Sequence, residues 1–153
     1  LPRKGAYVAN ISVKDLMDVL EIRASLEGLG ASLAAERRTE EDIKNLEEIE
    51  EEFEQAVITQ DIDMLLKKDI EFHECIFKAA NNKKLEKMIN TLWEQVQRFR
   101  ITYVSDSNAS LSLIDEHRII LNAIKEGNVA DGKKAAIEHI EKAEQFMLEH
   151  CTK

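Results

Sequence analysis

The chain has 153 residues and a net charge of −9, because 30 Asp and Glu outnumber 21 Lys and Arg. This length suits one domain with a sizeable core, and 44% hydrophobic residues exclude a disordered chain. The acidic balance argues against direct nucleic-acid binding, which needs clustered Lys and Arg. Apolar runs are too short for a membrane span, and two cysteines support no disulfide framework or Cys-based zinc site. We therefore expect a cytoplasmic protein without a membrane partner.

Proline occurs once, at Pro2, so the rest of the chain contains no strong helix breaker. Ser12, Thr39 and Asn128 are each followed three residues later by Asp, a spacing typical of helix N-termini. Gly127 and the polar run 104–108 indicate further breaks. These signals predict an all-α fold. In chain order, the predicted helices span residues 13–37, 40–59, 62–80, 84–104, 111–126 and 129–150.

The predicted helices carry apolar stripes of helical spacing, which favours an antiparallel bundle. Helix 40–59 has its apolar face at Ile43, Leu46, Ile49, Phe53 and Val57. We interpret the acidic run on the remaining faces, Glu47, Glu48, Glu50, Glu51, Glu52 and Glu54, as solvated. Helix 13–37 has a row of small residues at Ala24, Gly28, Ala31 and Ala35. This row predicts a closely packed helix, within the chain or in a dimer.

Four polar side chains interrupt the apolar stripes. Asp69 and His73 are four residues apart on helix 62–80, so both project from one face. His117 and His139 lie on the inward stripes of the last two helices. Each histidine alone is typical of a hydrogen-bonded core residue. Together with Asp69 they offer nitrogen and oxygen donors suited to zinc, nickel, manganese or iron, and a divalent ion would compensate the buried carboxylate.

Arginine also occurs at inward or marginal positions. Arg23 lies on the core side of helix 13–37, where it forms either an ion pair with Glu27 or a site for the carboxylate of a small molecule. Arg98 and Arg100 offer a similar, weaker case. Both interpretations of Arg23 stay open from the sequence.

Several catalytic motifs are absent from the sequence. Neither His-Glu-x-x-His nor Glu-x-x-His occurs, which excludes helical zinc proteases and ferritin-like carboxylate sites. No glycine loop for phosphate and no nucleophile elbow is present. We therefore do not expect an enzyme, although a metal-dependent enzyme acting on small carboxylates remains an alternative.

Three segments carry a resemblance to a known family. Residues 15–27, the segment 69–82 with its Asp-x-x-x-His start, and the pair Glu116-His117 followed by His139 resemble the C-terminal effector-binding (FCD) domain of GntR-family, FadR-subfamily bacterial transcription regulators. Residues 2–9 are similar to the end of that family's winged helix-turn-helix. The resemblance implies that residues 1–11 are a remnant of the wing and linker, and that residues 12–153 form a ligand-binding and dimerisation domain.

The resemblance also implies a function and a site. It implies a homodimer of helical bundles, each with a central cavity that holds a divalent transition metal and a small organic-acid effector bound to it. Zinc and nickel are the preferred metals, and manganese and iron are further candidates. The implied metal ligands are Asp69, His73, His117 and His139, and Arg23 and Arg98 are the expected effector-binding residues. Operator DNA would bind only through a missing N-terminal domain. The alternative to effector sensing is a structural dimerisation module locked by metal.

Overall fold

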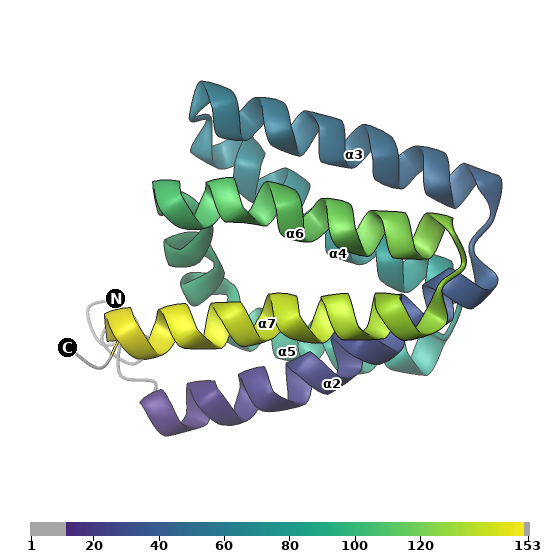
Figure 1. Cartoon of the computed structure of the whole chain (residues 1–153). Helices are drawn as coiled ribbons and strands as arrows, with labels where there is room; N and C mark the ends of the chain where they lie inside the picture. The colour runs from purple at the N-terminus through teal and green to yellow at the C-terminus, as the bar shows by residue number, and fades with distance from the viewer. Residues whose placement is uncertain (1–11, 152–153) are drawn as a thin grey trace.

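The computed structural model describes residues 12–151, which form six α-helices joined by short turns (Figure 1). The helices are α2 (Val13–Arg37), α3 (Glu40–Thr59), α4 (Ile62–Ala80), α5 (Lys83–Ser105), α6 (Ser107–Lys125) and α7 (Val129–Cys151). The predicted all-α fold is therefore confirmed. Residues 1–11, the expected wing and linker remnant, lie outside the described residues. Across the described helices, no stretch combines the length and apolar character that crossing a bilayer requires.

The predicted caps begin the helices. Ser12 accepts a hydrogen bond from the backbone N–H three residues on, and Thr39 forms a reciprocal capping box. Asn128 accepts from the backbone N–H of residue 131 at the start of α7. Asp61 and Asn82 cap α4 and α5 in the same way. The four turns after α2, α3, α4 and α6 lie within two residues of the predicted positions.

The break between α5 and α6 is shorter than predicted. The sequence predicted a helix start at residue 111, whereas α6 begins at Ser107. Asp106 ends one helix and begins the next, because its N–H donates to Tyr103 while its Oδ1 accepts from the N–H groups of Asn108 and Ala109. One side chain thus replaces a loop of several residues.

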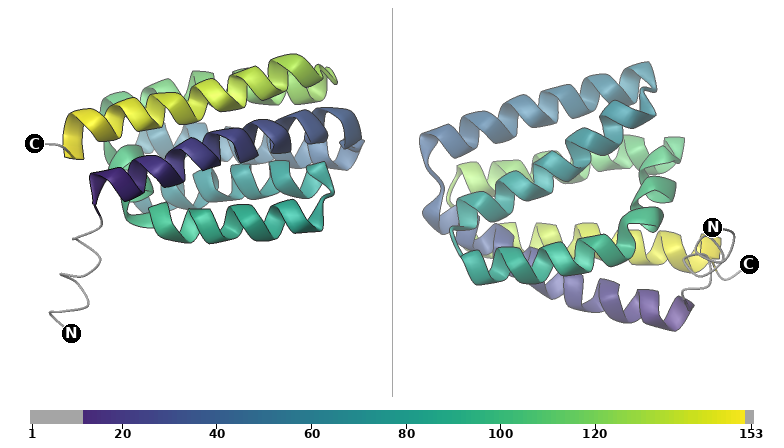
Figure 2. Two further views of the ribbon diagram at one scale, coloured as in Figure 1. Left: turned by 90° about the horizontal axis from the view of Figure 1, so that it is seen from below. Right: turned by 180° about the vertical axis from the view of Figure 1, so that it is seen from behind.

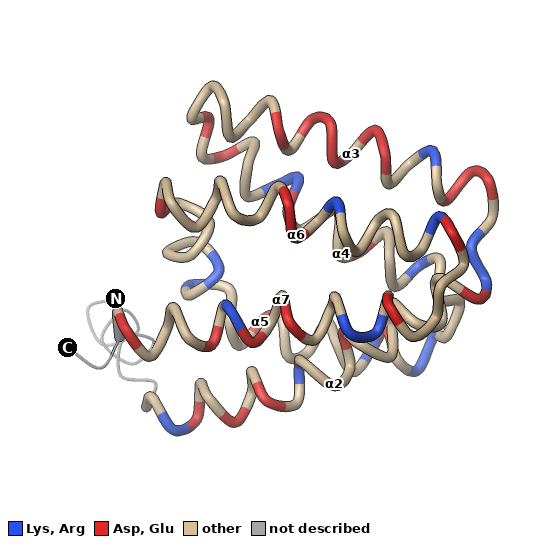
Figure 3. The backbone as a smooth tube through the Cα atoms, in the orientation of Figure 1, with Lys and Arg blue, Asp and Glu red and all other residues tan. Residues whose placement is uncertain are grey.

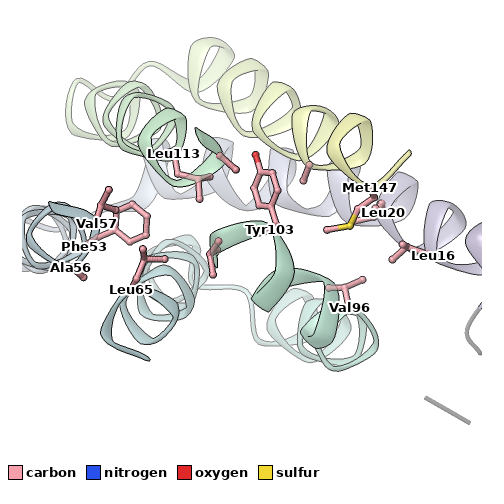
Figure 4. Close-up of a cluster of buried hydrophobic side chains, with 13 residues drawn as sticks. Leu16, Leu20, Phe53, Ala56, Val57, Leu65, Val96, Tyr103, Leu113 and Met147 are labelled. Carbon is pink, nitrogen blue, oxygen red and sulfur yellow. The ribbon is translucent and has the colours of Figure 1, made fainter. Parts of the chain in front are cut away.

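Helix α2 lies against most of the bundle. It packs on α7, α4, α5 and α6, and seen from below it runs between α7 and α5 (Figure 2). Helix α3 covers the opposite side by packing on α4 and α6. One buried hydrophobic cluster, drawn in Figure 4, includes Tyr103, Leu113 and Met147 from three helices. The core therefore continues through the bundle and surrounds the inward polar residues.

The small residues of α2 allow close packing within the chain. The whole predicted row is buried, and a Cβ at Gly28 would lie 2.8 Å from Cγ1 of Ile137 on α7. Gly132 of α7 in turn faces the backbone of Ala31. The row of small residues therefore packs against α7 within the chain.

Gly30→Ala should destabilise the fold although Ala favours helix. A Cβ at Gly30 would lie 2.7 Å from the ring of Phe77, which is 2% exposed. We expect overpacking to outweigh the gain in helix propensity and to lower the free energy of unfolding by about 1–2 kcal/mol. Urea denaturation measures this change, with exposed Ser25→Ala in the same helix as the control. A Gly30→Ala protein as stable as the parent would contradict the packing argument.

Candidate metal and effector site

The structure brings the four predicted metal ligands together in the centre of the bundle. Asp69 and His73 come from α4, His117 from α6 and His139 from α7. None is more than 4% exposed. The three histidines each offer one ring nitrogen, and these nitrogens lie within 4.8 Å of one another. Residues separated by up to 70 positions in the chain thus point to one place.

The facing atoms are the Nε2 nitrogens and one carboxylate oxygen. Nε2 of His139 lies 3.3 Å from Nε2 of His73, and Nε2 of His117 lies 3.2 Å from Oδ1 of Asp69. Ligand atoms that share a metal at about 2.1 Å lie about 3.0–3.4 Å apart, so the spacing fits a metal ion. Nε2 of His117 is buried without a hydrogen-bond partner among the described residues, and a bound cation would use its lone pair.

Each histidine is oriented by a buried glutamate. Nδ1 of His73 is 2.9 Å from Glu27, Nδ1 of His117 is 2.8 Å from Glu50, and Nδ1 of His139 is 2.7 Å from Glu116. A carboxylate accepts a hydrogen bond, so it favours the proton on Nδ1 and leaves Nε2 with its lone pair. Histidines that bind metals commonly have such partners. All three Nε2 atoms could therefore bind one ion.

Stacked rings fix the orientation of the most buried histidine. Phe72 lies parallel to His117 with ring centres 4.2 Å apart, and Phe53 contacts it at 4.6 Å. His117 is 0% exposed. Its imidazole therefore has little freedom to rotate away from Asp69.

Two buried arginines lie beside the histidines. Arg100 Nε is 3.1 Å from Oδ2 of Asp69, while its Nη2 is buried without a hydrogen-bond partner among the described residues. Arg23 Nε donates to Glu27 at 2.9 Å, as the ion-pair interpretation predicted. Trp93, the single tryptophan of the chain, donates to the same oxygen. Arg23 also lines the central cavity, so its structural contact leaves the second interpretation open.

The buried charges do not balance without a cation. The site contains four carboxylates, those of Glu27, Glu50, Asp69 and Glu116, but only two guanidinium groups. With three neutral histidines two negative charges remain uncompensated in the interior, and with a protonated His117 one remains. Buried charge is costly unless it is paired, and a divalent cation would compensate this excess.

Burial and neighbouring charges shift the pKa values of the predicted ligands. Burial opposes ionisation of Asp69, but His117 and Arg100 hold the pKa of this carboxyl well below its usual range. Burial lowers the pKa of His73 to about 4 in spite of two nearby carboxylates. Burial also acts on His117, but Asp69 and Glu50 outweigh it and raise its pKa to about 9. The position between His117 and Asp69 therefore attracts a cation, whether a proton or a metal ion.

The cavity beside the predicted ligands is small. It has a volume of about 20 Å³, enough for one water molecule, and Arg23, Arg100, His73 and His139 are among the residues that line it. Apolar side chains close it on the other sides, among them those of Leu20, Val96 and Met147. The central cavity expected for an organic acid is not open in this structure.

Two charged residues lie differently from the sequence prediction. The acidic run predicts a solvated Glu50, whereas Glu50 is 3% exposed and contacts His117, and Ile49 is only half-buried. Arg98 is exposed and does not line the cavity, while Arg100 faces inward. Steps of three and four residues from one buried apolar side chain to the next could have identified both residues. Counted in this way, the buried stripe of α3 includes Glu50 and the buried stripe of α5 includes Arg100.

Comparison with known proteins places the chain among bacterial regulators. LutR of Bacillus subtilis, an HTH-type transcriptional regulator, is 31% identical over 139 residues, which cover 88% of this chain and 63% of LutR. The gluconate operon transcriptional repressor of Bacillus subtilis is 24% identical over 130 residues, covering 82% of this chain and 54% of the repressor. The chain thus spans somewhat less than two thirds of the length of these relatives. Their names describe transcriptional regulators and not enzymes.

Solved structures share the same fold. McbR/YncC of Escherichia coli has a TM-score of 0.83 at 21% identity, over 92% of this chain and 71% of that one. GntR of Streptococcus agalactiae has a TM-score of 0.76 at 26% identity, over 90% of this chain and 63% of that one. The family model described as the FCD domain matches residues 18–142. The chain therefore belongs to the FCD domain family, the effector-binding domain of GntR-type transcription regulators.

Proposed function

We propose that this domain senses a small organic acid through a divalent transition metal held by Asp69, His73, His117 and His139. The main support for this proposal is that each histidine contacts a glutamate through Nδ1, which leaves the three Nε2 atoms free to bind an ion. A packed core needs none of these glutamates, whereas a metal site uses each of them. Zinc or nickel suits this donor set, and manganese or iron would also accept it.

Arg23 and Arg100 are the proposed partners of the effector's carboxylate. Both arginines line the cavity together with Asp69, His73 and His139, and Nη2 of Arg100 is buried without a hydrogen-bond partner among the described residues. A bound divalent ion supplies an open position that attracts an anion, and a guanidinium can hold a second oxygen. Because Arg98 is exposed, we do not include it in the proposed site.

Effector binding requires the cavity to widen. A volume of about 20 Å³ is too small for an organic acid, so side chains between α2, α5 and α7 must move. An effector that prefers the widened arrangement shifts the population toward it, and the difference in affinity is the energy available for regulation. We propose that this shift controls a DNA-binding domain of the full regulator, which operates in the cytoplasm and binds operator DNA.

Two other functions remain alternatives. The small cavity supports a structural module, in which the metal locks the bundle and no effector binds. A metal-dependent enzyme would need an open position and a base near the substrate. Thermal shifts and turnover measurements with the same acids separate these classes, because an effector shifts stability without turnover, an enzyme consumes the acid, and a structural site responds to metal alone.

Replacing one imidazole should remove most of the metal. His117→Ala deletes a proposed metal bond, so we expect its metal affinity to fall by more than about 100-fold, from one ion per chain in the parent. Elemental analysis and titration of the stripped protein measure this loss. His150→Ala is the matched control, since His150 is exposed and far from the site along α7. Full metal content in His117→Ala would refute the assignment.

The glutamate missed in the sequence should contribute to metal affinity. Glu50→Gln removes the carboxylate charge beside Nδ1 of His117 and introduces an amide that no longer fixes the proton there, so we expect metal affinity to fall about 10-fold or more. Glu51→Gln, on the exposed face of the same helix, is the control. Equal affinities in competition with a coloured chelator would show that Glu50 does not orient His117.

The arginine pair should distinguish the effector site from the metal site. We expect metal-loaded protein to show a thermal shift with at least one acid among acetate, malate, citrate and gluconate. Arg100→Gln should raise the acid concentration needed for that shift by about 10-fold, since a charge-assisted hydrogen bond is lost. Arg98→Gln is the control and should behave like the parent. If Arg98→Gln weakened binding and Arg100→Gln did not, the original assignment of Arg98 would be restored.

A further inference from the structure

The central cavity has a polar part and an apolar part. The six polar residues that line it are Arg23, Asp69, His73, Arg100, Tyr103 and His139. The other seven lining residues have apolar side chains. Five of these seven form what we call the apolar wall: Leu20 of α2, Val96 and Phe99 of α5, and Ala143 and Met147 of α7. A ligand in this cavity therefore meets charged groups on one side and hydrocarbon on the other.

The polar and apolar parts follow one another along the helices. Leu20 lies three residues before Arg23 on α2, and Ala143 lies four residues after His139 on α7. Residues at these intervals share one face of a helix and lie about one turn apart. Because α2 and α7 run in opposite directions (Figures 1 and 2), both helices place their apolar residues at the same end of the cavity. Figure 4 shows Leu20 and Met147 together at this end.

The cavity offers few hydrogen-bond partners beyond those at its charged end. Nη2 of Arg100 is the one buried polar atom of the described lining residues that lacks a partner, whereas Nε of Arg23 already donates to Glu27. Tyr103 is the single polar lining residue outside the proposed metal and carboxylate sites. A buried hydroxyl group without a hydrogen-bond partner is costly. A ligand with many hydroxyl groups therefore does not match this cavity.

The charge of the site limits how many carboxylates a ligand can bring. Four buried carboxylates face two guanidinium groups, so a divalent ion with neutral histidines brings the sum of charges to zero. Every further carboxylate then adds one uncompensated negative charge to the interior. The whole chain has a net charge of −9, and Figure 3 shows acidic positions in red along α2, α3 and α7. The site therefore favours a ligand with one carboxylate over a ligand with two or three.

On the basis of the proposed effector function, we propose that the effector is an aliphatic monocarboxylate. Its carboxylate binds at the charged end of the cavity beside Arg100, and its hydrocarbon tail lies against the apolar wall. The wall is long enough for a short chain, because His139 and Met147 are eight residues, or about 12 Å, apart along α7. Methionine is unbranched and adapts its shape readily, so Met147 suits a cavity that must widen. Sugar acids and acids with several carboxylates are disfavoured.

Hexanoate, gluconate and adipate test this proposal, because they have equal numbers of carbon atoms. Gluconate adds hydroxyl groups and adipate adds a second carboxylate. In isothermal titration of the metal-loaded protein, hexanoate should have a dissociation constant at least about 10-fold lower than those of the other two acids. Acetate, butyrate and hexanoate should bind progressively more tightly, by at least about 3-fold for each added pair of methylenes. Tighter binding of gluconate or adipate, or a series without this trend, would overturn the proposal.

Val96→Thr tests the apolar wall itself. Threonine has nearly the shape of valine but places a hydroxyl group against the tail, so the dissociation constant of hexanoate should rise about 3-fold to 10-fold. That of acetate, which has no tail to reach the wall, should stay unchanged. Val104→Thr is the matched control, because Val104 is equally buried on the same helix but is not among the residues that line the cavity. Equal effects of the two variants on hexanoate would refute the role of the wall.

Two further measurements keep the outcomes distinct. If circular dichroism shows that Val96→Thr does not fold, Ala143→Ser adds a hydroxyl group to the wall from α7, with buried Ala136→Ser as its control and the same expected result. Burial of the tail should also make the heat-capacity change of binding more negative for hexanoate than for acetate. Tighter binding of another acid class refutes the aliphatic monocarboxylate alone. Failure of every acid to bind the metal-loaded protein refutes effector sensing as well.

Discussion

The contacts between buried glutamates and histidines are the constraint on which the rest of this structure depends. Carboxylates inside a bundle cost free energy unless hydrogen bonds and opposite charge compensate them. Here five of the six helices supply a histidine or the glutamate that contacts it, and α5 supplies Arg100 and Trp93. The helices must therefore pack in one register for the charges to meet. The same interactions that make the centre specific also prepare it for a cation.

Helix α2 combines two tasks on two sides. Its small residues allow α7 to pack closely, and its inner edge places Arg23 and Glu27 at the site. Ile22 and Arg23 are neighbours in the chain but point to different sides of the helix.

Much of the site followed from periodicity, and the errors came from small differences in helical phase. Asp69, His73, His117 and His139 all occupy inward positions, as their spacing from apolar neighbours predicted. The acidic run hides Glu50 because it contains five other glutamates, and the apolar Ile49 next to Glu50 occupies the predicted core position. A rotation of 100° per residue separates neighbours on a helix, so an error of one or two positions moves a side chain between the interior and solvent.

The sequence by itself determined the helices, their caps and the polar residues that face inward, because these depend on residues within a few positions of one another. Only the tertiary structure decided which groups meet. The histidines His73, His117 and His139 contact glutamates 46, 67 and 23 positions away, and such pairs are set by how the helices pack. Local sequence patterns likewise could not predict the size of the cavity, because the cavity is the small space left between side chains from several helices.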